Sequence, residues 1–287
     1  MAVRQVIISI LVLLSLSRLD RKRVKSLIRN YAIRFCHGML SWLCRPYRLR
    51  TGPCIVFAPH QDDETLGCGG LIARKRNEGL AVHVVFITDG AASHPGHPRL
   101  SRPDISVLRR REALAALAVL GVESCAIHFL NEPDGTLNNV TPAGQVELVG
   151  SITRLLTTIA PDEIFLPCSP DGSSEHDAAF YFVCQALART PLHCDVWQYP
   201  VWSWWNPLLL LERMIFTTGR CAQPTEDFRQ IKARAMSHYR SQIEPTAPWR
   251  DPVLPPELVG IFNADKEFYF RFIPPAPGDL RSPRRVI

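Results

Sequence analysis

The sequence predicts a three-layer α/β fold in which helices flank a mainly parallel, Rossmann-like sheet. From residue 53 onward, short runs rich in β-branched and aromatic residues alternate with longer helical stretches. Strands that are separated by helices need crossover connections, and such connections produce parallel strands. With 287 residues, of which 46% are hydrophobic and 21% charged, the chain can bury one large core.

Five strands and five helices are predicted along the chain. The strand runs are short and apolar, and the helical stretches place apolar residues three or four positions apart. Sites in sheets of this kind lie beyond the carboxyl ends of the strands, so we expect functional side chains in the loops that follow them. The predicted strands are residues 54–58, 82–88, 125–130, 163–166 and 194–199, and the predicted helices are residues 66–78, 105–120, 143–159, 178–188 and 228–242.

Three parts of the chain are predicted: a basic amphipathic segment at residues 1–50, an α/β domain at residues 51–273, and a tail at residues 274–287 that we expect to be disordered. Residues 1–50 contain eleven Lys and Arg residues and one acid, Asp20, whereas the rest of the chain contains 22 basic and 26 acidic residues. Because the positive charge is confined to one end and lies next to apolar sequence, we expect no nucleic-acid partner. An anionic membrane surface is the favoured partner for this end.

The N-terminal segment is predicted to be neither a cleaved signal peptide nor a membrane span. Its apolar run at residues 6–16 is too short to cross a bilayer unaided, and a basic cluster follows where a cleavage site would lie. Beyond this cluster, apolar residues from Val24 to Trp42 recur at helical spacing. We expect an amphipathic helix that either packs on the domain or makes peripheral contact with a membrane through residues 1–50.

The cysteines favour a reducing compartment. There are nine, they are scattered, and no CxxC pair occurs, which argues against a disulfide framework and against a cysteine zinc site. The expected location is cytoplasmic, with the inner face of the membrane as an alternative.

The most informative segment follows the first predicted strand and reads Pro-His-Gln-Asp-Asp-Glu over residues 59–64. An imidazole and several carboxylates are costly to desolvate there unless a cation takes up their charge. His60 and Asp63 are three residues apart, so one turn can direct both side chains to one point. Asp62 projects differently and is available to hydrogen-bond a metal-bound water. The alternative is an acidic cluster that complements a helix dipole.

A second polar segment, residues 170–178, follows the fourth predicted strand. It contains His176, which can add a third protein ligand from a separate loop and leave an open coordination position, as hydrolytic zinc sites require. Taken alone, a single loop histidine is more often a surface residue.

Together the two segments resemble the LmbE/PIG-L family of zinc-dependent N-acetylglucosaminyl deacetylases. The first motif of that family reads AHPDDE, and residues 58–64 here read APHQDDE, with an inserted proline and with Gln61 in place of the motif proline. The second motif reads like DGHPDHEA, and residues 171–178 here read DGSSEHDA. The likeness runs in order from about residue 53 to residue 245, and it also includes Thr88-Asp89-Gly90, Arg109 with Glu112, Leu120-Gly121, Asp134-Gly135, and Lys232 with Tyr239, Ser241 and Gln242.

The resemblance implies that residues 51–273 form a metal-dependent deacetylase domain. Its expected activity is removal of the acetyl group from an N-acetylglucosamine-type amino sugar in a glycan or glycolipid. Zinc is the implied cofactor, with iron or another divalent ion as the alternative. The implied roles are metal binding by His60, Asp63 and His176, general base catalysis by Asp62, and substrate binding by Asp89, Arg109 and Asp134.

Two positions depart from the second motif of the family. Its first histidine helps to protonate the leaving amine, and here that position is Ser173. The aspartate that precedes its ligand histidine is Glu175 here. Asp62 can return its proton as a single acid and base, or a loop histidine, His94 or His97, can supply one, although each of these is more often a solvated surface residue.

These departures leave two alternative functions open. One is hydrolysis of an amide on another N-acylated glycoconjugate. The other is a sugar-binding domain without turnover, because Ser173 replaces the motif histidine.

Overall fold

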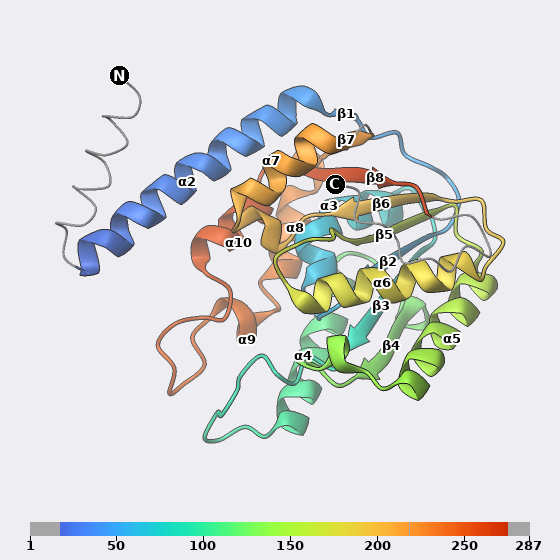
Figure 1. Ribbon diagram of the computed structural model, residues 1–287, viewed down its shortest axis with the longest axis horizontal. Helices are drawn as coiled ribbons and strands as arrows, with labels where there is room; N and C mark the ends of the chain where they lie inside the picture. Colours follow the sequence, from blue (N-terminus) through green and yellow to red (C-terminus); the bar gives the residue numbers. More distant parts are fainter. Residues whose placement is uncertain (1–17, 218, 275–287) are drawn as a thin grey trace.

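Figure 1 shows the computed structural model of the protein, which describes residues 18–217 and 219–274. In helix α2 the side chains of residues 18–23 and 25 are outside this description. The apolar run at residues 6–16 and, apart from Pro274, the tail that was expected to be disordered also lie outside the described residues.

One eight-stranded sheet runs through the described part of the chain, in the order β1-β7-β8-β6-β5-β2-β3-β4. Its strands are parallel except that β8 runs antiparallel to both of its neighbours, β6 and β7. The predicted α/β fold with a mainly parallel sheet is therefore confirmed. The strands are Arg45–Pro46 (β1), Cys54–Ala58 (β2), Val82–Thr88 (β3), Ile127–Glu132 (β4), Glu163–Pro167 (β5), Asp195–Tyr199 (β6), Arg220–Pro224 (β7) and Lys266–Phe272 (β8).

The five predicted strands correspond to β2 through β6. β2 and β3 have the predicted bounds, whereas β4 begins later because a 3₁₀ turn occupies Ser124–Ala126. The sequence does not predict β1, β7 or β8. β1 has two residues and β7 contains a proline and an arginine, so neither shows the composition typical of a strand.

Helices cover both faces of the sheet and complete three layers (Figure 1). Side chains alternate along β2, so Ile55 and Phe57 join the core under α5 and α6, whereas Val56 joins the core under the other helices. The helices are Arg18–Leu43 (α2), Asp63–Asn77 (α3), Arg102–Val119 (α4), Pro142–Ile159 (α5), Ser174–Ala188 (α6), Pro207–Phe216 (α7), Arg229–Met236 (α8), Arg240–Ile243 (α9) and Pro256–Phe262 (α10).

The helix predicted at residues 228–242 is interrupted. α8 ends at Met236 and α9 begins at Arg240, because Tyr239 has a ψ of 51°, which is not helical. The other four predicted helices begin one to four residues earlier than expected. The first turns of α3, α4 and α6 are polar, so apolar periodicity does not reveal them.

A buried polar cluster attaches residues 45–50 to the sheet. The hydroxyl of Tyr47 donates to Glu163, and Lys75 Nζ lies 2.8 Å from Glu163 Oε2. Lys75 also donates to the carbonyl of Arg50 at 2.9 Å. Lys75 and Glu163 are almost completely buried, and their opposite charges offset each other. Through these contacts, residues 45–50 pack as part of the α/β domain.

Helix α2 is the amphipathic helix that the sequence predicts, and it packs on the domain. It does so through Ile33, Cys36 and Leu40. The apolar stripe used to predict it lies mostly on the opposite side, where Tyr31 and Trp42 are exposed. None of the helices in the described residues is both long and apolar enough to cross a membrane.

Candidate metal centre

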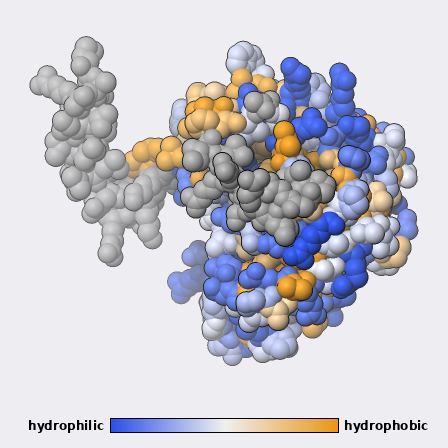
Figure 2. All heavy atoms as spheres, turned by 45° about the vertical axis from the view of Figure 1, so that its right-hand side comes forward, coloured by the Kyte–Doolittle hydropathy of each residue, from blue (hydrophilic) through white to orange (hydrophobic). Residues whose placement is uncertain are grey.

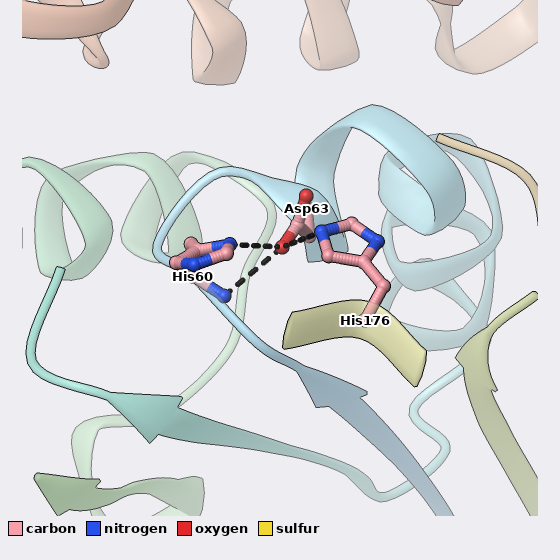
Figure 3. Close-up of side chains that lie close together, drawn as sticks. All are labelled: His60, Asp63 and His176. Carbon is pink, nitrogen blue, oxygen red and sulfur yellow. Dashed lines mark hydrogen bonds and ion pairs between the residues drawn. The ribbon is translucent and has the colours of Figure 1, made fainter. Parts of the chain in front are cut away.

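Three side chains predicted to bind a metal come together at the carboxyl ends of β2 and β5. His60 follows β2, Asp63 is the first residue of α3, and His176 lies in the first turn of α6, which follows β5. β2 and β5 are parallel neighbours, so the loops that leave them meet at one edge of the sheet. Figure 3 shows Asp63 between the two rings, with its Oδ2 atom 3.3 Å from Nδ1 of His60 and 3.4 Å from Nε2 of His176.

This arrangement fits a divalent cation. The three candidate ligand atoms lie within 4.8 Å of one another, and two imidazoles with one carboxylate make up a donor set that zinc accepts in catalytic sites. Nε2 of His176 is buried and has no hydrogen-bond partner among the described residues. A buried polar atom without a partner is costly, and a cation held by the three side chains would remove that cost.

In each histidine ring, the nitrogen that is not near Asp63 contacts a carboxylate. Asp171 Oδ2 lies 2.8 Å from Nδ1 of His176, and Glu175 Oε2 lies 2.8 Å from Nε2 of His60. Asp134 Oδ1 also lies 3.2 Å from that Nε2 atom. A ring that donates an N–H to a carboxylate presents the lone pair of its other nitrogen, here toward Asp63, and such partners orient metal-binding histidines.

The acids that surround the rings favour positive charge. Burial alone would lower the pKa of His176, but Asp63 and Asp171 raise it to about 9. Burial would likewise lower the pKa of His60, yet Asp134, Asp63 and Glu175 raise it well above its ordinary value. The same electrostatic field that holds protons on these rings would stabilise a metal cation in their place.

Asp171 and Glu175 contact the two histidine rings, and the sequence assigns no role to either of them. Asp171 accepts hydrogen bonds from the backbone of Val201, Trp202 and Ser203 as well as from the His176 ring. Glu175 accepts from the backbone N–H of Leu137 through its other oxygen. Both lie within five positions of His176, and a carboxylate near a candidate ligand histidine is the sequence signal that could have indicated them.

Replacing Asp171 by Asn is expected to weaken metal binding by about 10–100-fold, the usual cost when a ligand histidine loses its carboxylate partner. The matched control is Ser203→Ala, which removes a hydrogen bond to Oδ1 of Asp171 and leaves its Oδ2 contact with His176 intact. Metal affinity measured by competition with a chelator, beside the free energy of unfolding of the metal-free proteins, checks this. Equal affinity losses in the two variants would show that Asp171 supports only the loop.

Asp62, the predicted general base, is next to the three ligands and does not cap α3. It occupies the N-cap position without a side-chain capping bond, so its carboxylate is not used to cap the helix. Its φ of 151° is unusual for a residue with a side chain, and such conformations cluster at functional sites. Burial raises the pKa of Asp62 to about 7, although Arg109, whose Nη2 is 3.4 Å away, opposes this rise.

The residues predicted to bind substrate lie around the site. Arg109 is 2% exposed and donates to the carbonyl of Gln61 at 2.6 Å. Asp89 accepts from the backbone N–H groups of Ala91 and Asp134, both at 3.0 Å. These contacts organise the loops around the site, and substrate binding by Asp89, Arg109 and Asp134 stays a prediction.

Two residues of the C-terminal motif, Tyr239 and Ser241, form hydrogen bonds with residues near the site. The hydroxyl of Tyr239 donates to Glu64, whose Oε2 accepts from the backbone N–H of Asp62 at 3.1 Å. Ser241 donates to Glu112 through its N–H at 2.8 Å and its hydroxyl at 2.6 Å. These contacts connect α9 to α3 and α4. The C-terminal motif therefore contains residues that support the helices around the site.

His94 and His97 are buried, and the expectation that each is a solvated surface residue is wrong. The two nitrogens of His94 lie 2.9 Å from the Ser93 hydroxyl and 3.2 Å from the Thr246 hydroxyl, and its ring stacks on Trp249. Nε2 of His97 donates to the carbonyl of Ala247 at 2.9 Å, and its Nδ1 accepts from backbone N–H groups. Both rings attach their loop to residues 246–249, and all four nitrogens are engaged.

The fold and the site define an α/β protein with a candidate site for one divalent metal ion. Residues 55–187 match the PIG-L family, whose family model is described as GlcNAc-PI de-N-acetylase. This part of the chain is similar to the PIG-L family, and the predicted resemblance is confirmed. Among curated proteins, none is similar enough in sequence to count as a match.

Solved structures share the fold at low sequence identity. N,N'-diacetylchitobiose deacetylase from Pyrococcus horikoshii is 20% identical with a TM-score of 0.52, over 66% of this chain and 69% of that chain. A triple mutant of a deacetylase of the teicoplanin biosynthetic pathway is 18% identical with a TM-score of 0.54, over 76% and 97%. The 4-carboxy-2-hydroxymuconate hydratase GalB from Pseudomonas putida KT2440 is 14% identical with a TM-score of 0.59, over 80% and 99%.

Proposed function

We propose that residues 51–273 form a zinc-dependent N-deacetylase that removes the acetyl group from an N-acetylglucosamine-type amino sugar in a glycan or glycolipid. The observation that carries this proposal is the convergence of His60, Asp63 and His176 beside the carboxylate of Asp62, which makes no capping bond with α3. The description of the PIG-L family model and the names of two structural neighbours, both deacetylases, support the choice of reaction.

His60, Asp63 and His176 would hold the metal, with Asp171, Glu175 and Asp134 orienting the two rings. When bound, zinc supplies a water whose pKa is lowered to about 7 and a Lewis acid for the acetamide oxygen. Asp62 accepts the proton of the attacking water as the general base. Arg109 and the unusual backbone of Asp62 keep this carboxylate in place.

The leaving amine needs a proton, and Asp62 is the group that we propose returns it. Ser173 replaces the histidine of the family motif, is partly exposed and makes no capping bond with α6. His94 and His97 are both engaged in loop contacts. One carboxylate that first accepts and then donates the proton completes amide hydrolysis without a further acid.

Incubation of the purified protein with a panel of N-acetylglucosamine conjugates, both lipid-linked and soluble, tests this function. Acetate and free amine are expected in equal amounts, and treatment with a chelator followed by zinc addition should abolish and restore their release. The free amine is the decisive product, because a hydratase shares this fold. Sugar binding without acetate release would replace the proposal by the binding-domain alternative, and release of a different acid would indicate another N-acylated glycoconjugate.

Substitution of Ser173 by His is expected to change turnover by less than about tenfold, because Asp62 already supplies the leaving-group proton and general acid catalysis adds about 10²–10⁴-fold only where it is missing. The measurement is kcat for acetate release from one N-acetyl sugar, with Ser174→His, at the exposed neighbouring position, as the control. A wild type that binds metal and sugar but releases no acetate until Ser173 becomes His would contradict the single-acid assignment.

A further inference from the structure

Helix α2 has two apolar sides, and only one of them is covered by the domain. Ile33, Cys36 and Leu40 belong to the hydrophobic core, and the guanidinium of Arg29 lies 3.4 Å from the ring centroid of Trp205. On the other side, Tyr31 and Phe35 are four residues apart and therefore lie on one stripe of the helix. This second side faces away from the core and has no partner among the described residues.

α7 extends the exposed apolar surface. It packs beside α2, as Figure 1 shows, and hydrophobic side chains gather on the left of the body in Figure 2. Eight of the twelve large hydrophobic side chains exposed in the described residues belong to these two helices, so the exposure is concentrated there. We call the following set the α2/α7 face: Leu27, Ile28, Tyr31, Phe35, Trp42, Leu208, Ile215 and Phe216, with exposed fractions from 52% for Phe216 to 83% for Trp42.

Charge distinguishes between the surfaces that could cover this face. The α2 sequence contains seven Lys and Arg residues and one acid, Asp20. A second copy of the chain would bring two such basic helices together, and their like charges would repel. An anionic lipid surface attracts the same charges, and Trp and Tyr side chains are suited to the boundary between lipid headgroups and acyl chains.

We propose that the α2/α7 face is a docking surface for an anionic lipid bilayer. In this arrangement α2 lies in the plane of the interface, with Tyr31, Phe35 and Trp42 inserted among the lipids and the exposed Arg34 near the headgroups. The catalytic domain stays in water on the far side of α2. The proposal rests on exposure and charge and does not depend on the proposed deacetylation.

Sedimentation of the full chain with lipid vesicles tests the docking surface. Binding is expected to vesicles of phosphatidylglycerol and phosphatidylethanolamine and to be weaker by about tenfold or more to phosphatidylcholine vesicles. It should fall as salt rises from 0.1 M to 1 M, because the screening length shortens from about 10 Å to about 3 Å. The triple substitution Tyr31→Ser, Phe35→Ser and Trp42→Ser is expected to weaken binding by about tenfold or more.

The matched control replaces three side chains of similar exposure elsewhere, Val107, Val146 and Ile273, by Ser and should bind like the wild type. Both triple variants should keep the wild-type circular dichroism, metal content and acetate release from a soluble substrate, so a loss of docking is distinguishable from a failure of the proposed reaction. Three results would overturn the proposal: equal binding to both kinds of vesicle, full binding by the α2 variant, or a lipid-free dimer that the α2 variant dissociates.

Discussion

Replacement of His60, Asp63 or His176 by Ala is expected to strip most of the bound metal from the purified protein. The three side chains are the complete candidate ligand set around Oδ2 of Asp63, and two remaining ligands chelate a divalent ion poorly. The loss of affinity should exceed the about 10–100-fold effect of removing a partner that only orients a ligand. Acetate release should fall with the metal content, since no other cation site supports the reaction in this proposal.

Elemental analysis of the three variants beside the wild type measures this effect. His238→Ala is the control, because His238 is exposed and lies outside the candidate ligand set, and it should retain the metal. The fold should survive in all four variants, which circular dichroism can verify, because the cores on both faces of the sheet do not include these side chains. Full metal content in all three ligand variants would remove the assignment of this site.

Asp62→Asn is expected to keep the metal and to lose about two or more orders of magnitude in kcat, because an amide cannot accept the proton of the attacking water. Asn has nearly the same shape as Asp, so the backbone conformation at position 62 should persist. The contact with Arg109 weakens, but Arg109 still donates to the carbonyl of Gln61. Initial rates of acetate release at saturating substrate, together with metal content, separate catalysis from metal binding.

Asp227→Asn, at an exposed position before α8, is the control for the loss of one negative charge and should be fully active. Near-normal turnover of Asp62→Asn would exclude Asp62 as the base. Loss of the metal in the same variant would instead make Asp62 a ligand and would require a different base.

Local sequence was sufficient to predict the central strands and the metal-site segments. The strands β2 and β3 are buried apolar runs bounded by turns, and such runs depend on neighbours in the chain. The spacing of His60 and Asp63 also acts locally, since one turn joins them. His176 is more distant in sequence. It follows another strand of the predicted parallel sheet, and the resemblance to the LmbE/PIG-L family implied its role as the third ligand.

The contacts that complete the site could not be predicted in the same way. Glu175, in the first turn of α6, and Asp134, in the loop after β4, approach the same nitrogen of His60. For Asp134, the resemblance to the family had implied substrate binding. The burial of His94 depends on Trp249, which is far along the chain. These partners depend on how segments that are distant in the sequence pack together. The residues that surround each histidine in the sequence do not indicate which partners it will have.

The amphipathic pattern of α2 shows the same division most clearly. By itself the sequence determined that residues near Val24 to Trp42 form a helix with an apolar stripe, because spacing of three and four residues is a local property. Only the tertiary structure decided which side is buried, and it buried Ile33, Cys36 and Leu40 while leaving Tyr31 exposed. The reason is that a helix packs through whichever side its neighbours complement in shape, and that choice depends on α7 and the sheet, which are distant in sequence.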